Sequence, residues 1–195
     1  MWDERYASPD YVYGTEPNDF LASVASRIPE GRVLSIADGE GRNGVYLATL
    51  GHEVTSVDAS AVGLAKAQQL AASRGVYITT TVADLAEYPI AAGAWQGIVS
   101  IFCHLPPPLR RMVHADVVRG LAPGGVYVLE GYTLDQLRHG TGGPSSVDLL
   151  LTLEAVRAEL AGLEFLHAVE LERDVQEGAF HSGRSAVVQV VARKI

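Results

Sequence analysis

The stretch that decides the fold is Val33-Leu34-Ser35-Ile36-Ala37-Asp38-Gly39-Glu40-Gly41-Arg42-Asn43-Gly44. Its apolar first half predicts a buried strand, and its glycines predict a tight turn that leads into a helix. A second apolar run ends at Asp58, 19 residues after Gly39. Glycines in such a turn let the backbone approach a ligand closely, and an acid at the end of the next strand can accept hydrogen bonds from ribose hydroxyls. The pattern therefore indicates a nucleoside-containing cofactor at the carboxyl edge of a parallel sheet.

The rest of the chain continues this alternation of strand and helix. We expect strands at 32–37, 53–57, 76–82, 97–103 and 126–132, with helices at 43–50, at 61–74 and from Pro106 to about Leu121. After a helical pattern over 149–160, two further strands at 165–171 and 186–192 are joined by a segment too short for a crossover helix, so they should pair antiparallel. The predicted fold is α/β: a doubly wound sheet of five parallel strands plus a C-terminal antiparallel hairpin, forming one domain over residues 1–195.

The composition excludes several classes of protein. The 195 residues carry a net charge of -8 and only two lysines, which does not suit nucleic-acid binding. No uncharged apolar run approaches the ~20 residues that a membrane span needs, and the charged, aromatic N-terminus does not resemble a signal peptide. The single cysteine, Cys103, fits a reducing cytoplasm, and no cluster of residues has metal-ligand spacing. We therefore expect a cytoplasmic protein that acts on a small molecule, without a metal; the sequence does not indicate an oligomeric state.

Six ordered blocks make the chain resemble a known family. They are 13–18 (YGTEPN), 39–43 (GEGRN), 57–60 (VDAS), 83–85 (ADL), 102–105 (FCHL) and 121–125 (LAPGG). The chain resembles the class I S-adenosylmethionine-dependent methyltransferases, and within them the tellurite-resistance-type and thiopurine-methyltransferase-like branch. The resemblance implies a Rossmann-like fold, S-adenosylmethionine as cofactor, and an N-terminal arm (residues 1–31) that folds over the cofactor as a lid. It also implies a small, soft or anionic methyl acceptor such as tellurite, selenite or a thiol.

The resemblance also implies which residues bind the cofactor. They are Tyr13, Ala37, Asp38, Gly39, Gly41, Arg42, Asn43, Asp58, Ala59, Ser60, Ala83, Asp84, Leu85, Phe102, His104 and Leu105. Purely structural roles stay open as alternatives: Asp58 or Asn43 caps a helix, and Arg42 pairs with a surface acid. The chain departs from the family pattern because Ser35 replaces the usual acid at the end of the first strand and Ala37 replaces the first glycine. The acid that meets the methionine amino group is therefore either Asp38 or a residue from elsewhere.

The predicted catalytic residues are His181, Arg184 and His104. We expect His181 and Arg184 in a turn before the last strand, where related proteins carry a His and an Arg; Arg offers a fork for an oxyanion, and His binds an anion or acts as a base. The loop at 138–144 is a weaker candidate for a further wall of the acceptor pocket. Cys103, Trp2, Tyr6 and Tyr11 are expected to serve packing.

Two other functions remain as alternatives. One is a nicotinamide-dependent oxidoreductase. The strict glycine pattern of that class requires glycine at three positions that Ala37, Gly39 and Arg42 occupy here, and the terminal hairpin also argues against it. The other is a protein that binds S-adenosylmethionine without catalysis, which the sequence does not distinguish from an enzyme.

Overall fold

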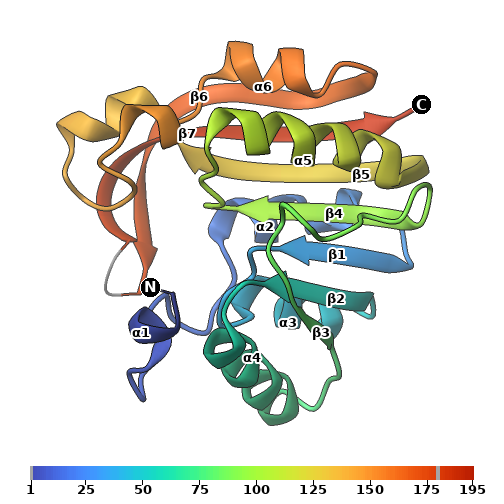
Figure 1. Cartoon of the computed structure of the whole chain (residues 1–195), viewed down its shortest axis with the longest axis vertical. Helices are drawn as coiled ribbons and strands as arrows, with labels where there is room; N and C mark the ends of the chain where they lie inside the picture. Colours follow the sequence, from blue (N-terminus) through green and yellow to red (C-terminus); the bar gives the residue numbers. More distant parts are fainter. Residues whose placement is uncertain (1, 179–180) are drawn as a thin grey trace.

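A single mixed sheet organises the chain in the computed structural model, which describes residues 2–178 and 181–195. The strand order is β3-β2-β1-β4-β5-β7-β6 (Figure 1). Strands β1 to β5 run parallel, β7 is antiparallel to β5, and β6 is antiparallel to β7. The expected five parallel strands and terminal hairpin are confirmed. The bounds are β1 (Arg32–Ile36), β2 (Glu53–Asp58), β3 (Thr79–Val82), β4 (Trp95–Ile101), β5 (Leu121–Tyr132), β6 (Leu163–Glu177) and β7 (His181–Lys194).

Helices cover both faces of the sheet because neighbouring residues of a strand point to opposite sides. Val33 packs in one apolar core with α2 (Asp19–Val24), α3 (Arg42–Thr49) and α4 (Ala61–Ser73). Leu34 packs in the other core with α5 (Pro107–Gly120) and α6 (Leu153–Glu159). The short helices are α1 (Trp2–Tyr6), η1 (Ala25–Arg27), η2 (Leu134–Arg138) and η3 (Val147–Leu149).

Side-chain caps fix the starts of two helices. The Asn18 side chain accepts a hydrogen bond from the Leu21 amide at 2.9 Å and caps α2. The Ser60 hydroxyl accepts from the Gly63 amide at 3.0 Å and caps α4. Each cap is worth about 1 kcal/mol of stability. They fix where these two helices begin relative to the ends of the strands.

The terminal hairpin is longer than predicted. The apolar runs at 165–171 and 186–192 are only its middle, because β6 extends to Glu177 and β7 begins at His181. Toward this end of the hairpin even the buried positions Glu177, His181 and Ser185 hold polar residues, so the apolar pattern that predicts a strand fades. In Figure 1 this far end of the hairpin curves down toward α1, on the side of the sheet where the parallel strands β1 and β4 end.

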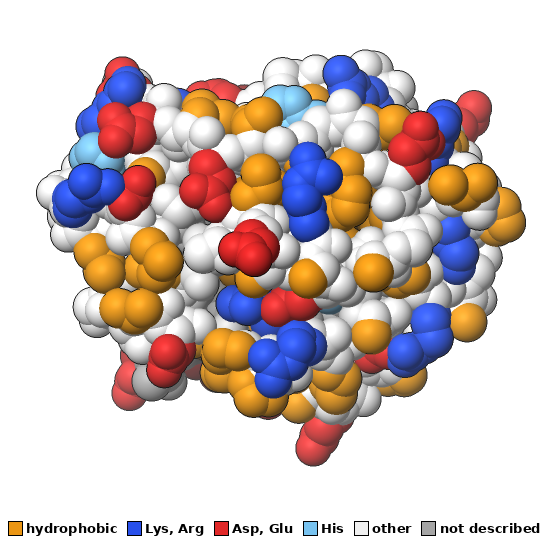
Figure 2. All heavy atoms as spheres, turned by 90° about the horizontal axis from the view of Figure 1, so that it is seen from above, with side chains coloured by type: hydrophobic (Ala, Val, Ile, Leu, Met, Phe, Trp, Pro, Cys, Tyr) orange, Lys and Arg blue, Asp and Glu red, His pale blue; other side chains and the backbone are white. Residues whose placement is uncertain are grey.

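The surface carries mixed charge. Figure 2 views the molecule from the side of α6 and β6, where lysine and arginine side chains lie between acidic and apolar ones rather than gathering by sign. Among the helices of the described ranges, none has the length and apolar character that a membrane span requires.

Candidate active site

A cavity of about 610 Å³ opens at the carboxyl ends of the parallel strands, within the usual size range of a ligand site. Open α/β sheets bind ligands at this edge. Most of the predicted cofactor residues line the cavity: Tyr13, Ala37, Asp38, Gly39, Arg42, Asn43, Asp58, Ala59, Ala83, Asp84, Leu85, Phe102, His104 and Leu105. Of the predicted catalytic residues, His104 and His181 line it and Arg184 does not.

The turn after β1 needs left-handed backbone at three positions. Ala37, Gly39 and Gly41 have φ angles of 50°, 56° and 83°. Left-handed backbone costs a residue with a Cβ ~1–2 kcal/mol, so Ala37 carries local strain at the position where the resemblance expects glycine. A Cβ on Gly41 would lie 2.4 Å from the Ala67 Cβ. Gly41 therefore lets α3 pack against α4. It was predicted to bind the cofactor, but it does not line the cavity.

The Asp38 carboxylate is held by hydrogen bonds within the fold. Its carboxylate accepts hydrogen bonds from the Ser35 hydroxyl at 2.7 Å, the Ser56 hydroxyl at 2.6 Å and the Gly44 amide at 3.2 Å. Burial raises the pKa of this carboxyl, and the two serine hydroxyls work against that rise. Ser35 thus donates to Asp38, and Asp38 in turn binds the first turn of α3 through the Gly44 amide. Of the two alternatives for the methionine amino group, this geometry disfavours Asp38.

Asp58 keeps capacity for a ligand. One carboxylate oxygen accepts the Gly39 amide at 2.9 Å and the other accepts the Ser60 amide at 2.8 Å. Each oxygen retains a second lone pair that a ribose hydroxyl can use. Ser60 itself lies outside the cavity lining, because its hydroxyl caps α4 and binds Asp3, so its predicted contact with the cofactor is not supported. Asp84 is exposed, and one of its oxygens accepts the Ala86 amide at 2.8 Å.

An aromatic cluster forms the wall near β4, β5 and β7. The His181 ring lies 4.6 Å from the rings of Tyr13 and Phe102 and 5.4 Å from that of Tyr132, measured between centroids. The Phe102 and Tyr132 rings stack at 4.6 Å, and His104 stacks on Tyr132 at 5.6 Å. Phe102 has a φ of 52°, a second strained residue at the cavity. Aromatic rings thus dominate this wall of the cavity.

Both histidines are neutral at physiological pH. Burial lowers the pKa of His104 to about 4 and that of His181 to about 3. The His104 Nδ1 donates to the Leu149 carbonyl at 2.8 Å, so its Nε2 is the acceptor for the Tyr132 amide at 3.4 Å. With both ring nitrogens held by backbone, His104 forms part of the wall and has no nitrogen left for proton transfer. The His181 Nδ1 is buried and has no hydrogen-bond partner among the described residues.

Arg184 is not in the turn predicted for it. It lies in β7, with 54% of its side chain exposed, and its Nε donates to Glu172 at 3.2 Å. The prediction was wrong because the hairpin continues as strand through 181–184, which turns alternate residues to opposite faces. His181 faces the cavity and Arg184 faces solvent. In the neighbouring loop, 142–144 lines the cavity while Arg138 and His139 pair with acids outside it.

Sequence reasoning found Tyr13 but missed other cavity residues of the arm. Trp2 and Tyr6, which were expected to serve packing only, line the cavity together with Arg5.

Glu40 and Lys66 form a buried ion pair, and the Lys66 ammonium also donates to the Ser8 and Asp10 carbonyls at 2.9 and 2.7 Å. The signal available in the sequence was Lys66 itself, a lysine beside the buried stripe of α4 residues Leu64, Ala67 and Leu70.

Cys103 also lines the cavity. Burial raises the pKa of its thiol to about 12, so it is protonated and a poor nucleophile at neutral pH. This agrees with its predicted packing role.

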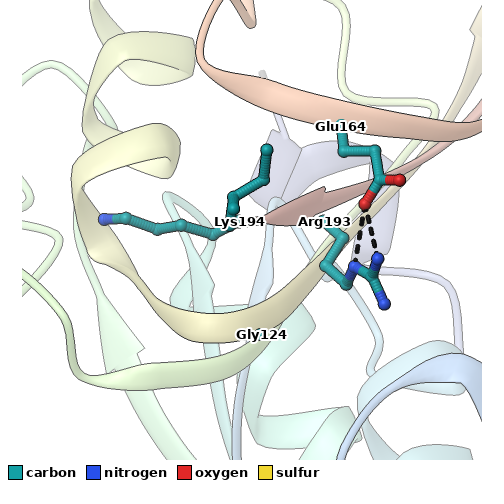
Figure 3. Close-up of a pocket in the computed structure, with 5 residues that line it drawn as sticks. Gly124, Glu164, Arg193 and Lys194 are labelled. Carbon is teal, nitrogen blue, oxygen red and sulfur yellow. Dashed lines mark hydrogen bonds and ion pairs between the residues drawn. The ribbon is translucent and has the colours of Figure 1, made fainter.

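A second depression, of about 430 Å³, lies at the opposite end of the sheet and is lined by Gly124, Glu164, Arg193, Lys194 and Ile195. Figure 3 shows Arg193 turned toward Glu164, to which it donates at 2.6 and 3.0 Å. Both side chains are nearly half exposed, so this is a solvated surface ion pair. It lies away from the carboxyl ends of the parallel strands and shares no lining residue with the larger cavity.

Residues 33–125 match a family model described as a methyltransferase domain. The matched range begins in β1, ends in β5, and includes the glycine turn and Asp58. A comparison of the sequence with curated proteins finds no match.

Solved structures share the fold at low sequence identity. One, from a study of the conversion of a disulfide bond into a thioacetal group during echinomycin biosynthesis, has a TM-score of 0.77 at 17% identity, over 98% of this chain and 87% of that one. TehB from Haemophilus influenzae has a TM-score of 0.73 at 20% identity, over 100% of this chain and 66% of TehB. The N-methyltransferase NodS from Bradyrhizobium japonicum WM9, in complex with S-adenosyl-L-homocysteine, has a TM-score of 0.71 at 16% identity, over 99% and 96%.

Identities this low concern the fold alone, so the finer placement in the tellurite-resistance-type branch stays a prediction. The residues present fit the cofactor, because Asp58 has lone pairs to spare and a buried Arg42 nitrogen has no partner among the described residues. The chain thus matches a methyltransferase-domain model over residues 33–125 and shares the fold of these solved structures.

Proposed function

We propose that the protein transfers a methyl group from S-adenosylmethionine to a small molecule with a soft acceptor atom that is mostly uncharged in solution, a thiol sulfur above all. The observation that carries the proposal is the division of one cavity. Asp58 and the glycine turn lie toward β1 and β2, while aromatic and neutral groups lie toward β4 and β7. The first part suits a ribose and the second suits an apolar acceptor.

When bound, the cofactor supplies a methyl group that its sulfonium already activates. The chain's part is therefore to align the acceptor and exclude water, and alignment alone can contribute ~7–11 kcal/mol. Asp58 accepts from the ribose hydroxyls, and Phe102 and Leu105 confine the acceptor near the end of β4. The arm residues Tyr6 and Tyr13 form part of the cavity wall and shield it from solvent.

The wall favours an acceptor that is mostly neutral in solution, such as a thiol, over tellurite or selenite. Arg184 points to solvent, and His181 carries no charge at neutral pH, so neither of the side chains first expected to hold an oxyanion does so. A group with a pKa of about 3 is also a weak base. Thiols suit such a site, because their ordinary pKa of about 8.5 leaves a few per cent of thiolate at neutral pH.

A turnover screen with the purified protein tests the proposal. S-adenosyl-L-homocysteine release would be followed with aromatic and alkyl thiols, with phenols and amines of matched shape, and with selenite and tellurite. We expect turnover with apolar thiols that exceeds turnover with the oxyanions. Turnover restricted to tellurite or selenite would contradict the acceptor class. Binding of cofactor without turnover of any acceptor would instead favour a non-catalytic binding protein.

The variant His181→Phe tests whether the cofactor part and the acceptor part of the cavity act independently. It keeps the aromatic shape and removes the ring nitrogen. We expect binding of S-adenosyl-L-homocysteine within about twofold of wild type and a change in turnover. An equal loss of S-adenosyl-L-homocysteine affinity and of turnover would contradict the assignment of His181 to the acceptor part of the cavity.

A further inference from the structure

The loop at 140–144 borders the cavity, and the function proposed above makes no use of it. Gly142, Gly143 and Pro144 line the cavity. Gly143 has a φ of 85°, and a Cβ on it would lie 2.6 Å from the Cδ2 of Tyr132. Only glycine therefore lets the loop lie directly on this ring. Because both glycines lack a side chain, Pro144 provides the side chain of this loop among the described residues of the cavity lining.

Tyr132 places the loop next to the acceptor part of the cavity. Its ring is fully buried and stacks on the rings of Phe102 at 4.6 Å and His104 at 5.6 Å. The His181 ring meets it edge-on at 5.4 Å. Those three side chains line the cavity and form its aromatic wall. The loop thus packs on the same ring that supports the aromatic wall.

Gln136 holds the loop through both ends of its side-chain amide. The Nε2 donates to the Thr141 hydroxyl at 3.0 Å and to the Gly142 carbonyl at 3.1 Å. The Oε1 accepts from the Ala186 amide of β7 at 2.9 Å. Gln136 is 1% exposed, so these bonds use both donors and the acceptor of a fully buried amide. An inverted amide would set donor against donor at Ala186, so the partners fix its orientation.

Thr141 attaches the loop to β7 a second time. Its hydroxyl accepts from Gln136 and donates to the Arg184 carbonyl at 2.7 Å. Its methyl group packs on Gly183, where an added Cβ would lie 2.8 Å from the Thr141 Cγ2. A loop rich in glycine loses much conformational entropy when it is ordered. The bonds of Gln136 and Thr141 therefore serve to hold it in one conformation.

We propose that this loop is the specificity-determining wall for the methyl acceptor, with Pro144 limiting the acceptor's width and Gln136 and Thr141 as positioning residues. The proposal rests on the function proposed above and names the residues that select among its acceptors. A thiol too wide for the space beside Pro144 should bind poorly, because steric exclusion needs no charged partner. One methylene group more or less in such an apolar pocket changes kcat/KM by ~10–200-fold.

Two thiols of different width test the wall. Steady-state turnover would compare propanethiol with cyclohexanethiol, and calorimetry would measure S-adenosyl-L-homocysteine affinity in the same proteins. Pro144→Ala removes the outer ring carbons from the wall. The kcat/KM for cyclohexanethiol relative to propanethiol should therefore rise about tenfold, mainly through KM. Affinity for S-adenosyl-L-homocysteine should stay within about twofold of wild type. An unchanged ratio of the two kcat/KM values would overturn the proposal.

Variants of the positioning residues test whether the loop must be held. Thr141→Val keeps the shape and removes the hydroxyl, so the ratio should rise about threefold while turnover of propanethiol changes little. Thr141→Ser keeps the hydroxyl and should retain the wild-type ratio. Gln136→Leu should move the ratio in the same direction as Thr141→Val. Gln96→Leu is the matched control, because Gln96 also accepts a backbone amide, that of Arg32 at 2.9 Å, but lies at the amino end of β4.

The outcomes separate this wall from the proposed function. Equal losses of cofactor affinity and of turnover with both thiols in the Thr141→Val protein would indicate damage to the fold alone and would refute the positioning role. Turnover of neither thiol by the wild-type protein would overturn the proposed function itself, and this wall with it.

Discussion

Lys66→Met should release the N-terminal arm from the cavity. The Lys66 ammonium donates to the carbonyls of Tyr6, Ser8 and Asp10 at 3.4, 2.9 and 2.7 Å and pairs with the Glu40 carboxylate. Both charged side chains are at least 89% buried. Removal of one partner from a buried ion pair costs ~3–5 kcal/mol, because the other charge is left uncompensated.

The cost should fall on the arm before it falls on the whole fold. Glu40 accepts the amides of Val12 and Tyr13 at 2.8 and 3.4 Å, so those two amides report directly on attachment of the arm. An added ~3 kcal/mol corresponds to faster hydrogen exchange by on the order of 10²-fold at these positions. Exchange in β4 and β5 should change far less. Hydrogen exchange read by NMR measures both in one experiment.

Two further variants make this prediction sharp. Lys66→Met combined with Glu40→Gln removes both charges and keeps an acceptor for the Val12 amide, so much of the loss should be recovered. Lys194→Met is the matched control, because the other lysine of the chain donates to the Val118 and Arg119 carbonyls and pairs with no carboxylate of the described residues. Wild-type exchange at Val12 and Tyr13 in the Lys66→Met protein would refute the reasoning.

Three other predictions follow from the site. Asp58→Ala should weaken binding of S-adenosyl-L-homocysteine at least tenfold by calorimetry, because charge-assisted hydrogen bonds contribute ~1.5–3 kcal/mol each; unchanged affinity would count against the ribose contact. His181 has a pKa of about 3 in the fold and about 6.5 when unfolded. Between pH 7.5 and 5 only the unfolded chain takes up this proton, so the free energy of unfolding decreases as the pH is lowered. His181→Phe should lessen that fall by about 2 kcal/mol in urea unfolding, and an unaltered fall would refute the assigned pKa. Gly41→Ala should destabilise by more than ~2 kcal/mol because its Cβ meets Ala67, whereas Ala37→Gly should stay within about 1 kcal/mol of wild type; similar losses in thermal unfolding would contradict the strain argument.

The strand and helix order could be predicted because buried parallel strands are continuous apolar runs. The apolar run from Gly97 to Cys103 predicted β4, and the glycine turn at 37–41 predicted the connection between β1 and α3. The ends of the hairpin could not be predicted in this way. Their buried positions hold polar residues such as Glu177, His181 and Ser185, so no apolar pattern marks them as strand.

The candidate site was predicted best where backbone conformation sets it. Glycines that require positive φ and an acid at a strand end mark Gly39 and Asp58 from the sequence alone. Long-range polar pairs leave no such pattern, so Lys66 with Glu40 and Arg42 with Glu177 emerged only from the fold. Arg184 was misplaced for a related reason, since one strand register decides whether a residue faces the cavity or solvent.

Calorimetric titration of the wild-type protein with S-adenosylmethionine and S-adenosyl-L-homocysteine, and with NADH as control, tests the central claim most directly. We expect both adenosyl ligands to bind with micromolar dissociation constants, which correspond to binding free energies on the order of −8 kcal/mol, and we expect NADH not to bind. Binding of NADH alone would contradict the account and favour an oxidoreductase at the same glycine turn.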